Sequence, residues 1–205
     1  MEIKSKRELA FVIQADRMMN RGKFKPSIFD FLKGIFMPDL IMSYLVAMRK
    51  TSYYKNSHSL WGKLHLLYYH HKFHRLAVKL GFSIGSDVFG YGLKIPHFGT
   101  IVVGGSNHIG NYAVLHTSTC ISSNGKVIGD GLYLSTGAKI TSKLVLGNNI
   151  SIGANSLVNK SFEKDNIMIA GIPAKYIKDA ETWYIRDNFA GKVDKIEKLK
   201  KEYGL

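Results

Sequence analysis

The sequence lacks the features of a secreted, disulfide-bonded or membrane-spanning chain. One cysteine, Cys120, occurs in 205 residues, which excludes an internal disulfide framework and a multi-cysteine zinc site. The early apolar run, residues 10–13, is too short for a signal-peptide core. The mostly apolar stretch 40–48 is far shorter than the roughly 20 residues of a membrane span. We therefore expect an unprocessed protein in a reducing compartment, the cytoplasm.

Acidic residues are scarce. Asp plus Glu total 15 against 29 Lys plus Arg, so the formal net charge is +14. Residues 1–81 hold 15 of the basic and 5 of the acidic residues, so most of the excess lies there. An anionic partner is expected. The nearly neutral middle segment and the absence of a recognition motif argue against nucleic acid.

The N-terminal part has helical periodicity. Apolar residues recur at helical spacing near residues 9–13, 28–35, 40–48 and 60–71, and Ser27 is placed as an N-cap. The stretch 60–80 mixes aromatic, histidine and basic residues. It predicts an amphipathic helix that packs on the main domain. A second interpretation is a basic face near anionic lipid or a lipid-linked glycan, at the inner face of the membrane.

The middle segment carries a six-residue repeat. Aliphatic or aromatic residues recur every six positions in runs separated by an eight-residue gap between Ile101 and Ile109 and a seven-residue gap between Ile121 and Ile128. An α-helix cannot use this period, whereas a triangular β-solenoid places one hexad on each face. We predict a mainly β fold with three parts: a helical region at 1–81, a parallel β-helix of about four coils at 82–174, and an extension with a helix at 175–205.

These repeats resemble the hexapeptide-repeat acyltransferases, which have a left-handed β-helix, and among them the serine acetyltransferases. The resemblance is carried by IPHFGTIVVGG (95–105), the later hexads, and AGIPAKYI (170–177). In that family the histidine of the first motif is the general base, and His97 matches it. An imidazole can accept the proton of an attacking hydroxyl at neutral pH. His116, one coil later, ranks second as an acceptor contact or alternative base.

The resemblance also implies acetyl-CoA as the donor, no metal, and a homotrimer whose donor sites lie between neighbouring β-helices. Small residues match the positions whose backbone meets the pantetheine arm, and a lysine matches a base near the cofactor phosphates. These residues are Gly137, Ala138, Gly153, Ala154 and Lys175.

Three departures from the family concern the support of the histidine and the binding of the acceptor. Ser83 stands about where an aspartate supports the histidine, with Asp87 nearby but out of register. Pro96 replaces an aspartate that helps to bind the amino acid. The loop 122–131 has neither residue of the family's Arg-His pair. We therefore expect the acceptor to be a sugar hydroxyl of a surface polysaccharide or its precursor, with serine as the alternative.

Other classes stay open at this point. A γ-class carbonic anhydrase shares the solenoid but needs three zinc-binding histidines, and His97, His108 and His116 lack that pattern. A non-catalytic scaffold is a further alternative, because the supporting carboxylate is missing. Cys120 is expected to pack rather than to react.

Overall fold

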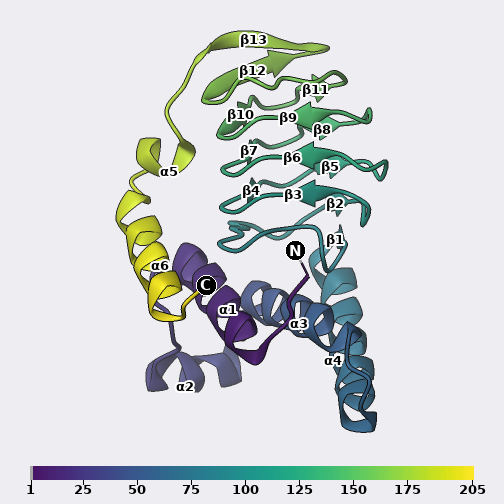
Figure 1. Ribbon diagram of the computed structural model, residues 1–205, viewed down its shortest axis with the longest axis vertical. Helices are drawn as coiled ribbons and strands as arrows, with labels where there is room; N and C mark the ends of the chain where they lie inside the picture. The colour runs from purple at the N-terminus through teal and green to yellow at the C-terminus, as the bar shows by residue number, and fades with distance from the viewer. Residues whose placement is uncertain (1) are drawn as a thin grey trace.

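The computed structural model describes residues 2–205. Four helices form one end of the molecule, a stack of short strands rises from them, and the C-terminal segment returns along the stack to the helices (Figure 1). Helices α3 and α4 share a hydrophobic core with the solenoid, in which the ring of Tyr44 lies 5.0 Å from that of Phe82. Helix α1 packs in a second cluster with the C-terminal extension.

Polar caps define the N-terminal helices. The helices are α1 (Lys6–Arg21), α2 (Ile28–Phe36), α3 (Leu40–Lys55) and α4 (Leu60–Leu80). Ser27 caps α2 as predicted, and Asp30 completes a capping box with it. Gly22 and Gly81 end α1 and α4 in the left-handed conformation that glycine adopts without strain.

The strands form three parallel sheets. One has the order β1-β2-β5-β8-β11, one has β3-β6-β9, and one has β4-β7-β10-β12 with β13 added antiparallel. This is the predicted β-helix, with four coils between the five strands of the first sheet. The strand bounds are β1 (Phe82–Ile84), β2 (Ile101–Val103), β3 (His108–Ile109), β4 (Val114–Leu115), β5 (Thr119–Ile121), β6 (Val127–Ile128), β7 (Tyr133–Leu134), β8 (Lys139–Ile140), β9 (Val145–Leu146), β10 (Ile150–Ile152), β11 (Leu157–Val158), β12 (Ile167–Gly171) and β13 (Ala174–Asp179).

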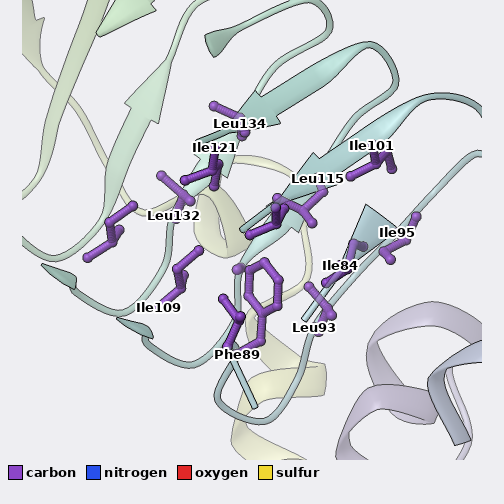
Figure 2. Packing of buried hydrophobic residues seen from close by; sticks show 14 of the residues in the cluster. Ile84, Phe89, Leu93, Ile95, Ile101, Ile109, Leu115, Ile121, Leu132 and Leu134 are labelled. Carbon is purple, nitrogen blue, oxygen red and sulfur yellow. The ribbon is translucent and has the colours of Figure 1, made fainter. Parts of the chain in front are cut away.

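The inward aliphatic residues stack on their equivalents in the coils above and below (Figure 2). The phase differs from the predicted one in the first coils. Val103, not Ile101, aligns with Ile121 and then Ile140, whereas Ile101 aligns with Thr119. The two extra residues therefore lie between Ile95 and Val103, not between Ile101 and Ile109. The error arose because Ile101 is also fully buried.

A buried ion pair joins the helices to the base of the solenoid. Arg49 on α3 donates to Asp16 on α1 at 2.8 Å and to the carbonyl of Phe89 at 2.8 Å. Asp16 in turn accepts from the backbone N–H of Leu93 at 2.9 Å. Both side chains are almost completely buried. The pair therefore satisfies backbone groups of the first coil that no earlier coil could reach.

The C-terminal extension runs from the last coil back to α1. It contains α5 (Trp183–Arg186) and α6 (Ala190–Glu202). The buried Trp183 donates to the carbonyl of Tyr112 at 2.8 Å, and Glu197 accepts from the hydroxyls of Tyr91 and Tyr112. Helix α6 packs against α1 of the same chain.

Within residues 2–205, no single helix is long and apolar enough to cross a membrane. Only α2 and α3 taken together meet that criterion, and they are bent by 106° at the break between them.

Candidate functional site

One corner of the solenoid gathers most of the residues predicted for the site. We call it the His97 corner; it comprises residues 96–100, 116–118, 135–137 and 153–155. Backbone hydrogen bonds hold its levels in register, with Gly137 N–H to Thr117 O at 3.1 Å and Asn155 N–H to Thr136 O at 2.9 Å. The predicted histidines and the predicted small residues therefore lie along one edge rather than on different faces.

The two-residue insertion described above falls at this corner. It carries His97 and Phe98 outward, and both side chains are exposed. Gly99 follows with φ +139° and donates its N–H to the carbonyl of Leu80 at 2.9 Å. Among the described residues, His97 has no hydrogen-bond partner. Its imidazole is therefore accessible to a substrate.

His116 lies one level above, in a more enclosed position. Its ring is half-buried and lies 5.1 Å from the ring of Tyr133. Burial lowers the pKa of His116 from its ordinary value, and the nearby His97 and Lys94 lower it further, against the opposing charge of Asp187. A histidine in this state is neutral at pH 7 and can accept a proton.

The C-terminal extension contributes charged groups that sequence analysis missed. Arg186 lies over the ring of Tyr133 at 4.4 Å, on the residue that also contacts His116, and it pairs with Asp187 at 2.8 Å. Lys94 lies over the ring of Phe189 at 4.6 Å. About 70 residues separate His116 from Arg186, and no motif marks the pair, so the sequence held no signal for this contact.

Ser83 and Asp87, the residues nearest in sequence to the position of the family's supporting aspartate, lie apart from this cluster. Asp87 is bound by Lys55 of α3 at 2.7 Å, so it anchors a helix. Ser83 is an exposed residue of β1 and pairs with Val102 of β2. Asp187 is the carboxylate whose charge reaches His116.

The residues predicted to meet the donor continue up the same edge. Ala154 is exposed beside Gly153, where an added Cβ would lie 2.8 Å from that of Ala170. Ala138 is buried in the core, and its N–H donates to Ser135 O at 3.1 Å. The Ala138 side chain therefore cannot touch a ligand, and the predicted backbone contact at this residue stays a prediction.

Gly137 has φ +75°, and its N–H donates to the carbonyl of Thr117. Lys175 is an exposed residue of β13, near the end of the edge remote from His97. Four level-to-level steps separate Gly99 from Gly171, which corresponds to about 19 Å at the usual strand spacing. An extended ligand could therefore run from the histidines to Lys175.

A groove of about 1210 Å³ adjoins the other side of His97. It lies between α2, α3, α4 and residues 96–98, and it combines apolar walls with basic residues. Its lining includes Phe31, Ile35, Leu40, Val46, Arg17, Arg21, Lys72, Lys79, Pro96, His97 and Phe98.

Across residues 2–205, no three His, Cys, Asp or Glu side chains come together as a metal site would require. The arrangement that the structure does contain is a pair of histidines, a cation cluster and a long edge lined by small residues.

Known proteins resemble this chain in sequence and in fold. The serine acetyltransferase of Buchnera aphidicola is 28% identical over 172 residues, covering 78% of this chain and 59% of that protein. That of Staphylococcus aureus is 26% identical over 147 residues, covering 61% and 66%. The chain thus spans about three fifths to two thirds of the length of these relatives. No family model matches the sequence.

Solved structures agree on the fold. A serine acetyltransferase in complex with CoA superposes with a TM-score of 0.59 at 21% identity, covering 82% of this chain and 67% of that one. The serine acetyltransferase of Neisseria gonorrhoeae gives 0.61 at 21% identity, covering 90% and 72%. The chain is a hexapeptide-repeat, left-handed β-helix protein similar to the serine acetyltransferases in sequence and in fold.

Proposed function

We propose that this protein is an acetyl-CoA-dependent O-acetyltransferase. The observation that carries the proposal is the His97 corner, where an exposed histidine and a half-buried one begin an edge lined by small residues. The sequence similarity to serine acetyltransferases supports the same reaction class.

In this mechanism His97 is the general base. Its imidazole takes the proton of the acceptor hydroxyl as that oxygen attacks the thioester carbonyl. The C–S bond then breaks, and the imidazolium returns the proton to the departing thiolate. The oxyanion that forms between these steps requires N–H donors other than those of Gly99, Gly137 and Asn155, which are already hydrogen-bonded. His116 serves as an acceptor contact or as a second base, because its lowered pKa keeps it neutral at pH 7.

The acceptor that the relatives favour is serine, since those named above are serine acetyltransferases. The sugar acceptor expected from the sequence has no such support. Moreover, the structure brings charged groups near His116. Lys94, from the first coil of the solenoid, and Arg186, from the C-terminal extension, offer cations for an α-carboxylate, and Asp187, which pairs with Arg186, offers an anion for an α-amino group.

A second acceptor class is favoured by the groove beside His97. Its volume of about 1210 Å³ far exceeds the needs of one amino acid, and its basic residues suit an anionic molecule. A sugar hydroxyl on an anionic carrier therefore stays as the second candidate.

The donor would lie along the exposed edge, with its phosphates near Lys175. A neighbouring β-helix packed against this edge would enclose it, so we infer a cyclic trimer with three equivalent donor sites.

Acetyl transfer measured with acetyl-CoA, comparing L-serine with free sugars and nucleotide-linked sugars, tests this proposal. We expect thiol release with serine, and a 10²- to 10⁴-fold lower kcat for His97→Gln because general-base catalysis contributes about that much. Thiol release only with a sugar would select the second acceptor. If the protein neither binds CoA nor turns over with any acceptor, the proposal fails and the non-catalytic scaffold is the remaining interpretation.

A further inference from the structure

Helix α2 presents its apolar face to solvent. The less exposed side carries Asp30 and Gly34, and no residue of the helix is buried. A surface helix of a globular protein normally shows the opposite orientation, with its apolar stripe toward the core. The exposed side chains are Ile28, Phe29, Phe31, Leu32, Ile35 and Phe36, with exposures from 54% for Leu32 to 87% for Phe36.

The first half of α4 shows the same feature. Its C-terminal end joins the core through Ala77 and Leu80, whereas large apolar residues near its start are exposed. These residues are Leu60, Trp61, Leu64, Leu67 and Tyr68. Together with the exposed face of α2 they form what we call the apolar end. Both helices reach the end of the molecule remote from β12 and β13 (Figure 1).

Positive charge surrounds the apolar end. From Leu40 to Leu80 the chain has no Asp or Glu and seven Lys or Arg. Lys33 lies within α2 and Lys63 within the first half of α4. The two nearby carboxylates are already engaged, Asp30 by Lys23 and Asp39 by Arg21. The net field at this end is therefore positive.

We propose that the apolar end docks this protein on an anionic lipid bilayer. Two separate apolar helix faces at one end of an elongated molecule suit a flat partner. Apolar side chains with lysines beside them suit insertion at the level of anionic headgroups. A second copy of this chain would instead bring like charges together. The proposal does not depend on the acetyl-transfer reaction.

Docking in this way would also set the position of the groove beside His97. The groove is lined by Phe31, Ile35 and Gly34 of α2. It would therefore lie next to the bilayer, within reach of an acceptor held at the membrane surface.

The full-length protein should sediment with vesicles of phosphatidylcholine mixed with phosphatidylglycerol, and hardly with pure phosphatidylcholine. The chain's two tryptophans give a second readout. Trp61 is 74% exposed and Trp183 is 1% exposed, so a blue shift of the emission on vesicle binding reports Trp61. Raised salt should reverse the binding, because salt screens the lysine contribution.

Variants locate the surface. Ile35→Ser with Phe36→Ser should weaken vesicle binding about tenfold or more, since both side chains would leave the lipid. Lys33→Gln and Lys63→Gln should each weaken it about fivefold. Val127→Ser with Val145→Ser, exposed apolar residues on the solenoid, is the matched control and should bind normally. Equal thermal melting of all variants shows that the fold is retained.

Two results would overturn the proposal. One is absence of sedimentation with the anionic vesicles. The other combines two observations: light scattering shows that the protein assembles without lipid, and Ile35→Ser with Phe36→Ser dissociates this assembly but leaves vesicle binding unchanged. That second result would identify α2 as a contact between subunits.

Discussion

The position of His97 affects the protonation of His116. Burial lowers the pKa of His116, and the positive charge of a protonated His97 lowers it further. In the pH range between the lowered pKa and the ordinary value of about 6.5, the unfolded chain binds more protons at this residue than the folded protein. The contribution of His116 to stability is therefore complete above about pH 6.5 and is lost as the pH falls through that range.

This coupling predicts a result for a single substitution. In His97→Gln, the pKa of His116 measured by NMR should rise toward its ordinary value, because one of the charges that lower it is gone. His74→Gln, a change on the exposed side of α4, is the control and should leave the titration of His116 unchanged. An unshifted His116 in the His97 variant would mean that the two rings do not interact.

The buried pair of Asp16 and Arg49 predicts a large effect on stability. Arg49→Leu leaves the Asp16 carboxylate buried without its partner, and the carbonyls of Phe89 and Gly90 lose their donor. We expect a loss of about 3–5 kcal/mol in the free energy of unfolding, measured by urea denaturation.

Arg21→Leu is the matched control, because it breaks the partly exposed pair with Asp39 at 2.5 Å. Its cost should stay within about 1 kcal/mol. Similar losses for the two variants would contradict a special role for the buried pair.

At the scale of the elements, two adjacent glycines test how tightly the coils stack. A Cβ on Gly104 would lie 2.7 Å from the backbone nitrogen of Ser123 in the next coil, and closer still to its Cα and Cβ. A Cβ on Gly105 would have only the Cα of Gly85 at 4.0 Å. Neither glycine has a positive φ. A comparison of alanine at the two positions therefore measures the effect of crowding, because neither position carries backbone strain.

We expect Gly104→Ala to lower the free energy of unfolding by about 1–3 kcal/mol. Gly105→Ala should be neutral or stabilising by up to about 1 kcal/mol, because alanine restricts the unfolded chain. Thermal melting of the two variants measures the difference. Equal melting temperatures would show that the coils can separate locally at low cost.

The repeat made most of the solenoid predictable. Inward residues at a fixed spacing give the coil count, the strand positions and the residues of the core, since each hexad meets the same environment as its neighbours. The phase was wrong only where Ile101 and Val103 are both buried. Apolar content alone could not distinguish the stacked position from the adjacent buried one.

The site was predictable where it follows the repeat and not elsewhere. His97, His116, Gly137 and Ala154 share the corner because residues one coil apart stack on each other. Arg186 and Asp187 reach it through the C-terminal extension, whose path depends on contacts such as Trp183 with Tyr112. No periodicity in the sequence records such a contact.

At the scale of the whole molecule, the inferred trimer predicts a mass in solution. Light scattering should give about 69 kDa, three copies of the 23.0 kDa chain. Lys175→Glu should raise the KM for acetyl-CoA without changing that mass, because the residue is exposed. A 23 kDa species that turns over at full rate would show that one copy completes the donor site.

The C-terminal extension links the last coil of the solenoid to the first helix. Many repeat proteins lose their terminal repeats first, because those repeats have a single neighbour. Here α6 rests on α1 while β13 pairs with β12 at the far end, so the C-terminal segment, which runs along the stack, ties its two ends together. A force that pulls the two termini apart must first detach α6 from α1. While α6 stays on α1, the applied force does not reach the coils. We therefore expect one early step, in which α6 separates from α1, followed by the loss of coils one after another.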